Sequence, residues 1–580
     1  MMTKEIIETI IEDEEIKAQT IPTGTDDFYK VRTVGYYYVD KTMMIRDFLA
    51  FNKEVTLISR PRRFGKTLNM TMLREFFDIT KESVAIFEGL AIMKSKYAVR
   101  MNSIPVIFFT LKGCKSDTFE GMKTDIAACL FDEFDKYYKI FKAAAVDDSE
   151  SEYRRFYEAH QTLELEEPSE RLLKISLVCL MKAVHKFYGI RPIVLIDEYD
   201  VPIINAHAFG FRSKLTGLLS MFFTRALKGN PDLDKAVLTG IQRIAKESIF
   251  SELNNLSVYT VIDERYASYF GFTPPEVEQA LIDHNTLAAI DEVRAYYDGY
   301  VFGEKYHIYN PWSILSFIEY RKLESYWMNT SINLLIRELV IHSTDLFVDS
   351  FHKLIEKGEA EVGINLKASF FELEEEETLW GLLVNAGYLT IIDVFSEDAM
   401  TVKIPNNEAR REFLKIVSKR NELNTTNLSR MFDSLFQVNI EKFLKNYQEL
   451  IYHYVSSHDI MSENSFHMLF LGMAISSSGM YQITSNIEAG DGRPDIVMES
   501  LLPDVRPHIV VEFKREDRVM RERKLNNSEM QEYTMGLANE AVTQIVKKNY
   551  AAKLTGSVLA VGVGHYKKHV QVMHQMIEVD

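Results

Sequence analysis

A basic loop near the start of the chain carries side chains of the types that can bind phosphate groups. The apolar run Val55–Ser59 leads into the segment RPRRFGKT, which ends at Thr67. Its last three residues match the phosphate-loop pattern G-x-x-x-x-G-K-[ST], whereas an arginine stands at the first glycine of that pattern. Gly65 would let the main chain approach the phosphates, Lys66 would reach the β- and γ-phosphates, and Thr67 would ligate Mg²⁺. The alternative is a basic turn in which Gly-Lys-Thr occurs by chance.

Two carboxylates follow another apolar run, Pro192–Ile196, and could complete a magnesium site. Acids at the end of a buried strand are costly unless they meet a cation or water. Asp197 would then hold the Mg²⁺ shell, and Glu198 would orient or activate the attacking water. A solvated strand end is the alternative, but loop and acids each follow a predicted strand and occur in the order that a nucleotide hydrolase requires.

A third apolar run, Lys235–Gly240, brings two more candidates to the same region. Thr239 could sense the γ-phosphate, and Arg243 could neutralise negative charge in the transition state. A surface salt bridge is the alternative for Arg243.

A different pattern of carboxylates and a lysine lies near the C-terminus. Asp495 opens one apolar run, and Glu512 and Lys514 stand two residues apart in another. Because side chains alternate along a strand, Glu512 and Lys514 share one face while Phe513 points to the other. Asp495 and Glu512 could share a divalent cation that polarises a scissile phosphate, and Lys514 could stabilise the developing charge. An acid followed by Glu-x-Lys is also common by chance, so the pattern depends on its context.

Four β-rich runs, separated by longer helical patterns, must position the first set of residues. Each is rich in Val, Ile, Leu or Phe, as strands buried on both faces are. The helices between them favour crossover connections and a parallel sheet, at whose carboxyl edge ligands bind. We expect the polar segment Val146–Arg155 to be an exposed loop. The four runs are Val55–Ser59, Ile104–Leu111, Pro192–Ile196 and Lys235–Gly240.

The pattern changes after residue 270. Thr273, Pro274 and Glu276 predict a capping box at a helix start. The chain then has a mostly helical pattern to about residue 420, with a hairpin near Tyr388–Ile404, and the polar stretch Asn421–Ser429 suits a linker. We therefore expect an α/β multidomain protein with an N-terminal arm (1–21), a P-loop domain (22–270), a helical or winged lid region (271–428) and a second α/β domain (429–580).

Several motifs together resemble the AAA-ATPase-like proteins that carry a C-terminal PD-(D/E)XK nuclease-like domain. The resemblance covers most of the chain from about residue 22 and includes the basic loop, so Arg60 is typical of the family. It implies an additional-strand P-loop ATPase core with a lid, ATP and Mg²⁺ as cofactors, and Arg60, Arg62 and Arg63 at the nucleotide. The motifs are Tyr36–Thr42 (YYYVDKT), Ser59–Thr67 (SRPRRFGKT), Leu195–Asp200 (LIDEYD), Leu238–Ser248 (LTGIQRIAKES), Phe250–Tyr259 (FSELNNLSVY), Tyr297–Gly303 (YDGYVFG) and Tyr309–Leu315 (YNPWSIL).

Two of these motifs have no evident catalytic chemistry. We interpret Tyr297–Gly303 and Tyr309–Leu315 as structural, with glycines at turns and Trp312 as a packing anchor. Asp40 and Lys41 either contact the nucleotide or form a simple ion pair.

The C-terminal pattern resembles the core of the PD-(D/E)XK nucleases. Its context is the segment GDGRPD, ending at Asp495, and the predicted order of helix, strands, Glu-x-Lys strand and helix. The resemblance implies Asp495, Glu512 and Lys514 as the motif, Glu463 as a further acid and Gln544 on the following helix. It also implies Mg²⁺, or Mn²⁺, and a DNA or RNA substrate.

Composition bounds these interpretations. The 580 residues are 46% hydrophobic and carry a net charge of −17, which excludes wholesale disorder and a protein that coats nucleic acid with its whole surface. A local basic groove remains compatible with this charge, so we expect nucleic acid at the C-terminal domain. Three scattered cysteines, no apolar run near the ~18 residues of a membrane span and no signal peptide favour the cytoplasm. A homo-oligomer is compatible with the sequence.

Two hypotheses follow from these patterns. The leading one is an ATPase coupled to a metal-dependent nuclease, in which ATP binding or hydrolysis gates the C-terminal site. The alternative is a nucleotide-dependent switch or a nucleic-acid-binding module whose nuclease-like domain is inactive. A compact cluster of Asp495, Glu512 and Lys514 disfavours the alternative, and a splayed arrangement favours it.

Overall fold

The computed structural model of this chain divides into two compact units. Unit 1 contains Met1–Ser331 and Glu361–Ala409, and unit 2 contains Ile332–Ala360 and Arg410–Asp580. The structure describes residues 19–147, 149–165, 167–242, 249–250, 253–303, 306–327, 347, 350–351, 354, 358–366, 376–396, 398–410, 425–454, 470, 474, 480–485, 489–503, 505–516, 520, 523 and 525–579.

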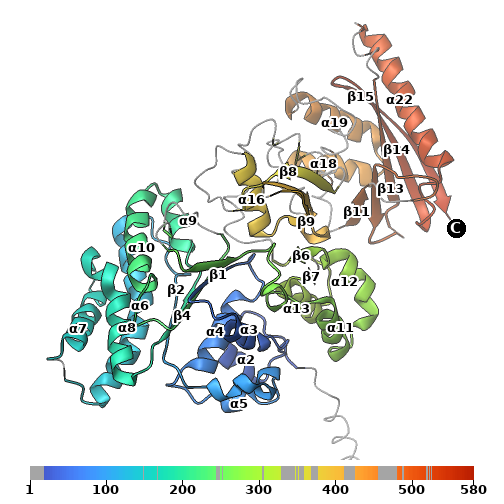
Figure 1. The fold of residues 1–580 in the computed structure, drawn as a ribbon. Coiled ribbons are helices and arrows are strands. Elements are labelled where there is room, and N and C mark those ends of the chain that lie inside the picture. Colours follow the sequence, from blue (N-terminus) through green and yellow to red (C-terminus); the bar gives the residue numbers. More distant parts are fainter. Residues whose placement is uncertain are drawn as a thin grey trace, which may run out of the picture. The chain divides into compact units, whose positions relative to one another are not determined.

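A five-stranded parallel sheet forms the centre of unit 1 (Figure 1). Its strand order is β2-β3-β4-β1-β5, which places β4 between the strand before the basic loop and the strand before the acids. The four predicted strands and their parallel direction are confirmed. The short edge strand β5 was not predicted. The strands are β1 (Val55–Ser59), β2 (Val106–Thr110), β3 (Ile193–Asp197), β4 (Lys235–Gly240) and β5 (Leu256–Tyr259).

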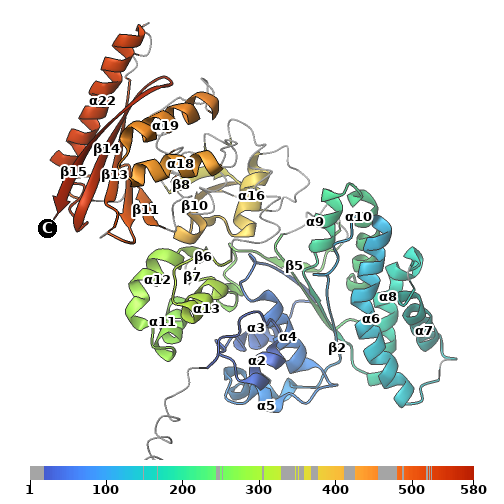
Figure 2. The same cartoon turned by 180° about the vertical axis from the view of Figure 1, so that it is seen from behind.

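Helices lie on both faces of this sheet (Figures 1 and 2). Alternate residues of the strands, such as Leu57, Phe109 and Ile196, pack with α6, α7, α8 and α10 in one apolar core. Helix α4 contacts β2, β3 and β4. The helices are α2 (Phe28–Val34), α3 (Met43–Phe51), α4 (Lys66–Phe77), α5 (Val84–Phe87), α6 (Phe119–Ala143), α7 (Ser151–Leu163), α8 (Glu170–Tyr188), α9 (Val201–Ala208) and α10 (Arg212–Leu227), with 3-10 turns at Ala91–Lys94 and Lys96–Arg100.

The predicted loop Val146–Arg155 is partly wrong, because α7 already begins at Ser151. Tyr153 and Phe156 are buried one turn apart and dock the start of this polar helix on α6. Two apolar anchors at helical spacing were enough to order a segment that is otherwise polar.

The region after the sheet combines short helices with small antiparallel sheets. The predicted capping box is confirmed, since the Glu276 carboxylate accepts the N–H of Thr273 at 2.7 Å. The predicted hairpin is also confirmed as β9 and β10. The elements are a 3-10 turn (Ala267–Tyr269), α11 (Pro274–Asp283), a 3-10 turn (Leu287–Ala289), α12 (Ile290–Tyr297), β6 (Tyr300–Phe302), β7 (Tyr306–Ile308), α13 (Pro311–Tyr320), β8 (Glu359–Gly363), α16 (Glu376–Ala386), β9 (Thr390–Val394) and β10 (Ala399–Lys403).

Unit 2 is built on a second five-stranded sheet in the order β11-β12-β13-β14-β15. Strands β13 and β14 are parallel, and their neighbours are antiparallel. Part of the predicted linker Asn421–Ser429 is helical instead, because α18 begins at Thr425. The elements are α18 (Thr425–Phe436), α19 (Ile440–Tyr454), β11 (Tyr481–Ser485), β12 (Ile496–Ser500), β13 (His508–Arg515), α22 (Asn527–Lys547), β14 (Gly556–Tyr566) and β15 (His569–Val579).

Two glycines explain how α22 can lie so close to this sheet. A Cβ at Gly562 would stand 2.1 Å from the carbonyl oxygen of Ala538, and one at Gly564 would stand 2.1 Å from that of Thr534. The helix therefore packs on bare backbone of β14, which brings it against β13 as well. Among the helices that the structure describes, none is both long and apolar enough to cross a bilayer.

A buried carboxylate, Glu408, holds the end of the segment that follows α13. Its side chain is fully buried and accepts hydrogen bonds from Ser313 Oγ at 2.8 Å and from the main-chain N–H groups of Tyr326 and Trp327 at 2.7 and 3.2 Å. Burial raises the pKa of Glu408 to about 7, and these hydrogen bonds oppose the rise.

We predict that Glu408→Gln stabilises unit 1 above neutral pH. The amide copies the protonated acid, because its oxygen accepts the two N–H groups and its NH₂ donates to Ser313. Between the unfolded pKa near 4.3 and the folded pKa near 7 the folded parent binds a proton that the unfolded chain has released, so the parent loses stability as pH rises through this window. The variant should match the parent near pH 4.5 and exceed it by roughly 1–3 kcal/mol at pH 8.

The measurement is the unfolding free energy or Tm of both proteins from pH 4.5 to 8, where the difference between them cancels other titrating groups. A difference that stays constant across this range contradicts the prediction.

Candidate nucleotide and nuclease sites

The basic loop closes around the amino group of Lys66. Gly65 has φ +84° and caps α4, so that Lys66 is the first residue of the helix. Its Nζ donates to the carbonyl oxygens of Arg60 at 3.0 Å and Pro61 at 2.8 Å. The lysine is therefore held inside the curve of the loop, at the positively charged end of α4.

The carboxylate of Asp197 joins the loop to two strand ends. Its Oδ2 accepts from Thr67 Oγ1 at 2.7 Å, and its Oδ1 accepts a short hydrogen bond from Thr239 Oγ1. Thr67 lies in the first turn of α4, Asp197 ends β3 and Thr239 lies near the end of β4, so three elements of the carboxyl edge meet at one carboxylate. The sequence predicted that these residues lie at one edge of the sheet, and in the structure their side chains are hydrogen-bonded to one another.

Two further acids follow Asp197 and have different environments. Asp200 is buried, and its Oδ2 accepts the N–H groups of Ile241 and Gln242 at 2.8 and 3.0 Å. Glu198 is half-buried and has φ +52°, a left-handed conformation that a glutamate adopts only when its surroundings hold it there. Burial raises the pKa of both carboxyls, and Lys66 opposes the rise.

Lys66 is the cation of this buried group. Burial lowers its pKa, while Glu198, Asp197 and Asp200 oppose the fall. Four ionisable side chains thus share a desolvated region, in which the attraction between lysine and carboxylates is strong. Such a group is suited to receive a polyphosphate and its counterion, because both kinds of charge are already present.

The three loop arginines have separate positions. Arg60 is fully buried and donates to the carbonyl oxygens of Ser59 at 2.8 Å and Tyr259 at 3.2 Å, with Phe270 and Phe302 beside its guanidinium. Its side chain therefore points into the protein and braces the loop, and a contact with nucleotide, as the resemblance implied, does not fit this position. Burial lowers its pKa to about 10.

Arg62 and Arg63 lie nearer to solvent than Arg60. Arg62 is half-buried; burial lowers its pKa, and the nearby acids Glu198 and Asp200 oppose this. Arg63 is exposed, has φ +66° and stacks its guanidinium 4.0 Å from the ring centre of Trp312. Arg62 thus faces the acidic group, whereas Arg63 contacts the region after the sheet.

The segment before β1 forms an ion pair. Lys41 Nζ lies 2.6 Å from the Glu276 carboxylate, the same side chain that caps α11. Asp40 accepts hydrogen bonds from Thr42 and from the N–H of Ala91. For Asp40 and Lys41 the geometry therefore fits a structural role and not a nucleotide contact, although the ion pair of Lys41 is with Glu276. Arg243 lies outside the described residues.

The two motifs without evident chemistry pack directly on the basic loop. Phe64 is buried between Tyr300 and Phe302, and Asn310 donates to the carbonyl oxygen of Arg62 at 3.4 Å. A Cβ at Gly387 would stand 2.9 Å from Pro61. These contacts, together with that between Trp312 and Arg63, hold the loop in its shape, so the two motifs have a structural role at the loop.

The second candidate site is a compact cluster on β12, β13 and α22 in unit 2. Asp495 Oδ2 accepts the N–H of Phe513 at 2.7 Å, and Glu512 Oε2 accepts the N–H of Asp495 at 3.2 Å. Lys514 Nζ lies 3.4 Å from Glu512 Oε1, which also accepts a short hydrogen bond from Gln544 Nε2. The four residues that the sequence singled out here thus lie together.

The two carboxylates of this cluster are not equivalent. Glu512 is 3% exposed; burial and then the charge of Asp495 raise its pKa to about 7, and Lys514 opposes the rise. Burial also raises the pKa of Asp495, with the Phe513 N–H and Lys514 opposing it. Ionising both of these adjacent acids costs free energy, because each is buried and the two negative charges repel. A divalent cation between them would offset this cost, so the pair is suited to bind one.

A glycine turn places Asp495 by docking on the end of α22. Gly490 has φ +54°, and a Cβ there would stand 2.2 Å from the carbonyl oxygen of Asn549. The N–H of Asp491 donates to the carbonyl oxygen of Lys548 at 2.9 Å. Tyr550, which the sequence did not single out, accepts a hydrogen bond from Gln544 Nε2 through its hydroxyl at 3.1 Å and so orients that amide.

Glu463, the further acid that the resemblance implied, lies outside the described residues. Within the described ranges, no group of three or more His, Cys, Asp or Glu side chains gathers as a metal site. Asp495 and Glu512 are therefore a two-carboxylate donor set there.

Two family models match separate stretches of this chain. Residues 22–250 match the family model of a predicted AAA-ATPase, and residues 461–575 match that of the PD-(D/E)XK nuclease superfamily. The chain thus carries an AAA-ATPase-like domain followed by a PD-(D/E)XK nuclease-superfamily domain.

One curated relative was found in Azotobacter chroococcum mcd 1, where it is described as an uncharacterized protein in the vnfD 5' region. It is 28% identical over 398 residues, which cover 67% of this chain and 68% of the relative.

We predict that Gly490→Ala loosens the second site. The new methyl group would strike main-chain oxygens of Lys548 and Asn549, which cannot move aside as a side-chain end can, and the positive φ adds strain. We expect a loss of at least about 2 kcal/mol in the protection of β12 and β13 amides against hydrogen exchange.

Gly536→Ala is the matched control. Gly536 lies within α22 with open space around its Cα, so the same change should stabilise that helix by up to about 1 kcal/mol. If both variants exchange like the parent, the glycine turn does not position Asp495.

Proposed function

We propose that this protein binds and hydrolyses ATP in unit 1 and cleaves phosphodiester bonds of DNA or RNA in unit 2. The observation that supports it is the gathering of each sequence motif into a compact group of opposite charges. In unit 1 these are Lys66 with Asp197 and Glu198. In unit 2 they are Lys514 with Asp495 and Glu512.

At the ATPase site the loop would undergo a simple exchange of partners. Lys66 would leave the carbonyl oxygens of Arg60 and Pro61 for the β- and γ-phosphates, while main-chain N–H groups at Gly65 and the start of α4 would hold the phosphates. Mg²⁺ would be held by Thr67 and Asp197 and would neutralise phosphate charge. Glu198 would orient the attacking water and accept its proton, a role that its raised pKa suits.

Three other residues would complete this site. Thr239 already holds Asp197 and would sense the γ-phosphate through that carboxylate. Arg62 would approach the phosphates from the loop, and Arg243 would neutralise transition-state charge in cis.

At the nuclease site Asp495 and Glu512 would hold Mg²⁺ or Mn²⁺. The cation would polarise the scissile phosphate and lower the pKa of bound water. Lys514 would stand beside the phosphate and stabilise negative charge as it develops, and Gln544 would keep Glu512 oriented. Glu463 is a further proposed acid. Nucleic acid would bind locally at this unit and not over the whole surface, because the chain as a whole carries a net negative charge that repels phosphates.

We predict that Lys66→Ala weakens ATP binding about 100-fold, on the order of 3 kcal/mol, because it removes a buried charge that pairs with phosphate. Lys53→Ala is the control, because Lys53 is exposed before the amino end of β1, at the opposite edge of the sheet. Calorimetric titration with ATP and Mg²⁺ measures both. Equal affinity of Lys66→Ala and parent rules out the phosphate-loop assignment.

We predict that Asp495→Asn and Lys514→Ala each reduce cleavage of labelled DNA or RNA with Mn²⁺ at least about 1,000-fold, since each removes a charge that acts on the scissile phosphate. Asp495→Asn should also weaken Mn²⁺ binding measured by electron paramagnetic resonance, whereas Lys514→Ala should retain it. Lys547→Ala, an exposed cation of the same unit, should cut like the parent.

Three outcomes distinguish the hypotheses. Loss of cleavage in both motif variants supports the nuclease. Cleavage at parental rate in both variants means that the nuclease assignment is wrong. Binding without cleavage by the parent supports a nucleic-acid-binding module instead.

A further inference from the structure

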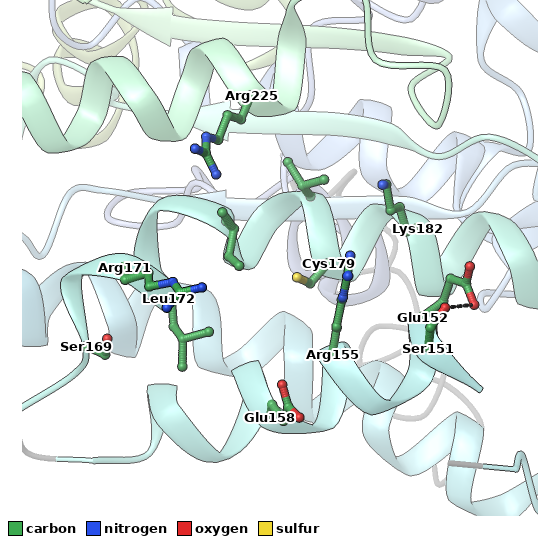
Figure 3. A pocket seen from close by; sticks show the side chains of 12 residues that line it. Ser151, Glu152, Arg155, Glu158, Ser169, Arg171, Leu172, Cys179, Lys182 and Arg225 are labelled. Atoms are coloured by element: carbon green, nitrogen blue, oxygen red, sulfur yellow. Dashed lines mark hydrogen bonds between the residues drawn. The ribbon is translucent and has the colours of Figure 1, made fainter. Parts of the chain in front are cut away.

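A groove on unit 1, lined by residues between Ser151 and Arg225, gathers four basic side chains. It has a volume of about 890 Å³. The outer face of α8 forms its floor, and α7 and α10 form its walls (Figure 3). Arg171 and Lys182 come from α8, Arg155 from α7 and Arg225 from α10.

None of these four cations forms an ion pair with another described residue. Neighbouring lysines do: Lys174 pairs with Glu170, and Lys186 pairs with Glu150 and Glu152. Of the two acids in the groove, Glu152 is thus already engaged, which leaves Glu158 against four positive charges. Like charges held this close repel one another, and an acidic partner would relieve the repulsion.

The floor of the groove is aliphatic. Leu172, Ile175 and Val178 follow one another at helical spacing on α8 and are half-exposed, and Cys179 is buried beside them. Among the described residues, no aromatic side chain lines the groove, so these residues offer no platform on which nucleic-acid bases could stack. A basic rim over an aliphatic floor instead fits a helix that is apolar on one face and acidic on the other.

The first 18 residues of the chain have this pattern. Ile6, Ile7, Ile10 and Ile11 recur at the spacing of one helical face. The same stretch contains six acids and two lysines, and Glu8 and Glu15 stand seven residues apart along one border of the isoleucine face. The segment therefore matches the groove in both of its chemical features.

The attachment point of this segment excludes the groove of its own chain. The carbonyl oxygen of Gln19 accepts a hydrogen bond from His284 at 3.0 Å, and Ile21 is buried with α11. Helix α11 and the groove helices lie at opposite ends of unit 1 in both views (Figures 1 and 2).

We infer that the groove between α7, α8 and α10 binds the acidic N-terminal segment, residues 1–18, of a second copy of this chain. The isoleucine face covers Leu172, Ile175 and Val178, and the acids pair with the groove cations. Because the segment and the groove of one copy are both left to bind further copies, the contact is head-to-tail and builds a ring or a chain of subunits.

Sedimentation velocity of the full chain over about a 100-fold range of concentration tests this inference. The parent should associate, and raised salt should weaken the association. Two variants should each raise the dissociation constant at least about 10-fold: Ile7→Asp with Ile10→Asp in the segment, and Arg171→Glu with Arg225→Glu in the groove. Lys94→Glu with Arg100→Glu makes the same charge change on exposed residues elsewhere in unit 1 and should leave association unchanged.

A charge swap separates pairing from damage to the fold. The double variant Glu8→Lys with Glu15→Lys should associate more weakly than the parent. Adding the Arg171→Glu and Arg225→Glu changes to it should restore association. A monomeric parent, or a swap that restores nothing, overturns the inference. So does a groove variant that loses binding to a fluorescent oligonucleotide yet associates like the parent, because nucleic acid is then the occupant.

Discussion

The buried charges at the carboxyl edge of the unit 1 sheet are the constraint on which the rest of this unit depends. One lysine and three acids lie there in a desolvated region, and leaving any of them unpaired would cost several kcal/mol. The backbone supplies the compensation: Lys66 bonds to two loop carbonyls, and Asp200 accepts two N–H groups from the turn after β4. Asp197 receives two threonine hydroxyls. Strand order, loop shape and the strained backbone of Glu198 all serve to keep these partners in place.

Unit 2 also contains buried charged side chains that need partners, but among its described residues the cluster has only two carboxylates. Asp495 and Glu512 are adjacent carboxylates with raised pKa values, and each accepts a main-chain N–H from the strand of the other. This reciprocal bonding fixes the two side chains relative to each other without a cation. Helix α22 then adds Gln544, and it can do so because Gly562 and Gly564 let it lie on β14. The two glycines therefore help to position the cluster, because a Cβ at either would clash with the backbone of α22.

The sequence predicted what depends on local patterns and missed what depends on packing. Four strands, the capping box and the hairpin follow from apolar runs and turn residues, and all were found. Strand β5 is a four-residue edge strand and has too short a pattern to recognise. The inward direction of the Arg60 side chain could not be predicted, because a sequence motif gives residue types and not the direction in which a side chain points. Tyr550 was missed for the same reason: its partner Gln544 is brought to it by the fold.

The contacts of the loop with the region after the sheet have a consequence for how a nucleotide would act on the protein. Phe64 is enclosed by Tyr300 and Phe302, and Arg63, in a left-handed conformation, is held against Trp312. If Lys66 exchanges its loop carbonyls for phosphate, the backbone of Arg60 and Pro61 loses two hydrogen bonds and can shift. Pro61 in turn lies under Gly387, where not even a methyl group would fit. A shift of the loop must therefore move the segments packed on it, because close-packed contacts transmit displacement and cannot absorb it. The motifs without chemistry of their own are thus the segments that a shift of the loop would displace.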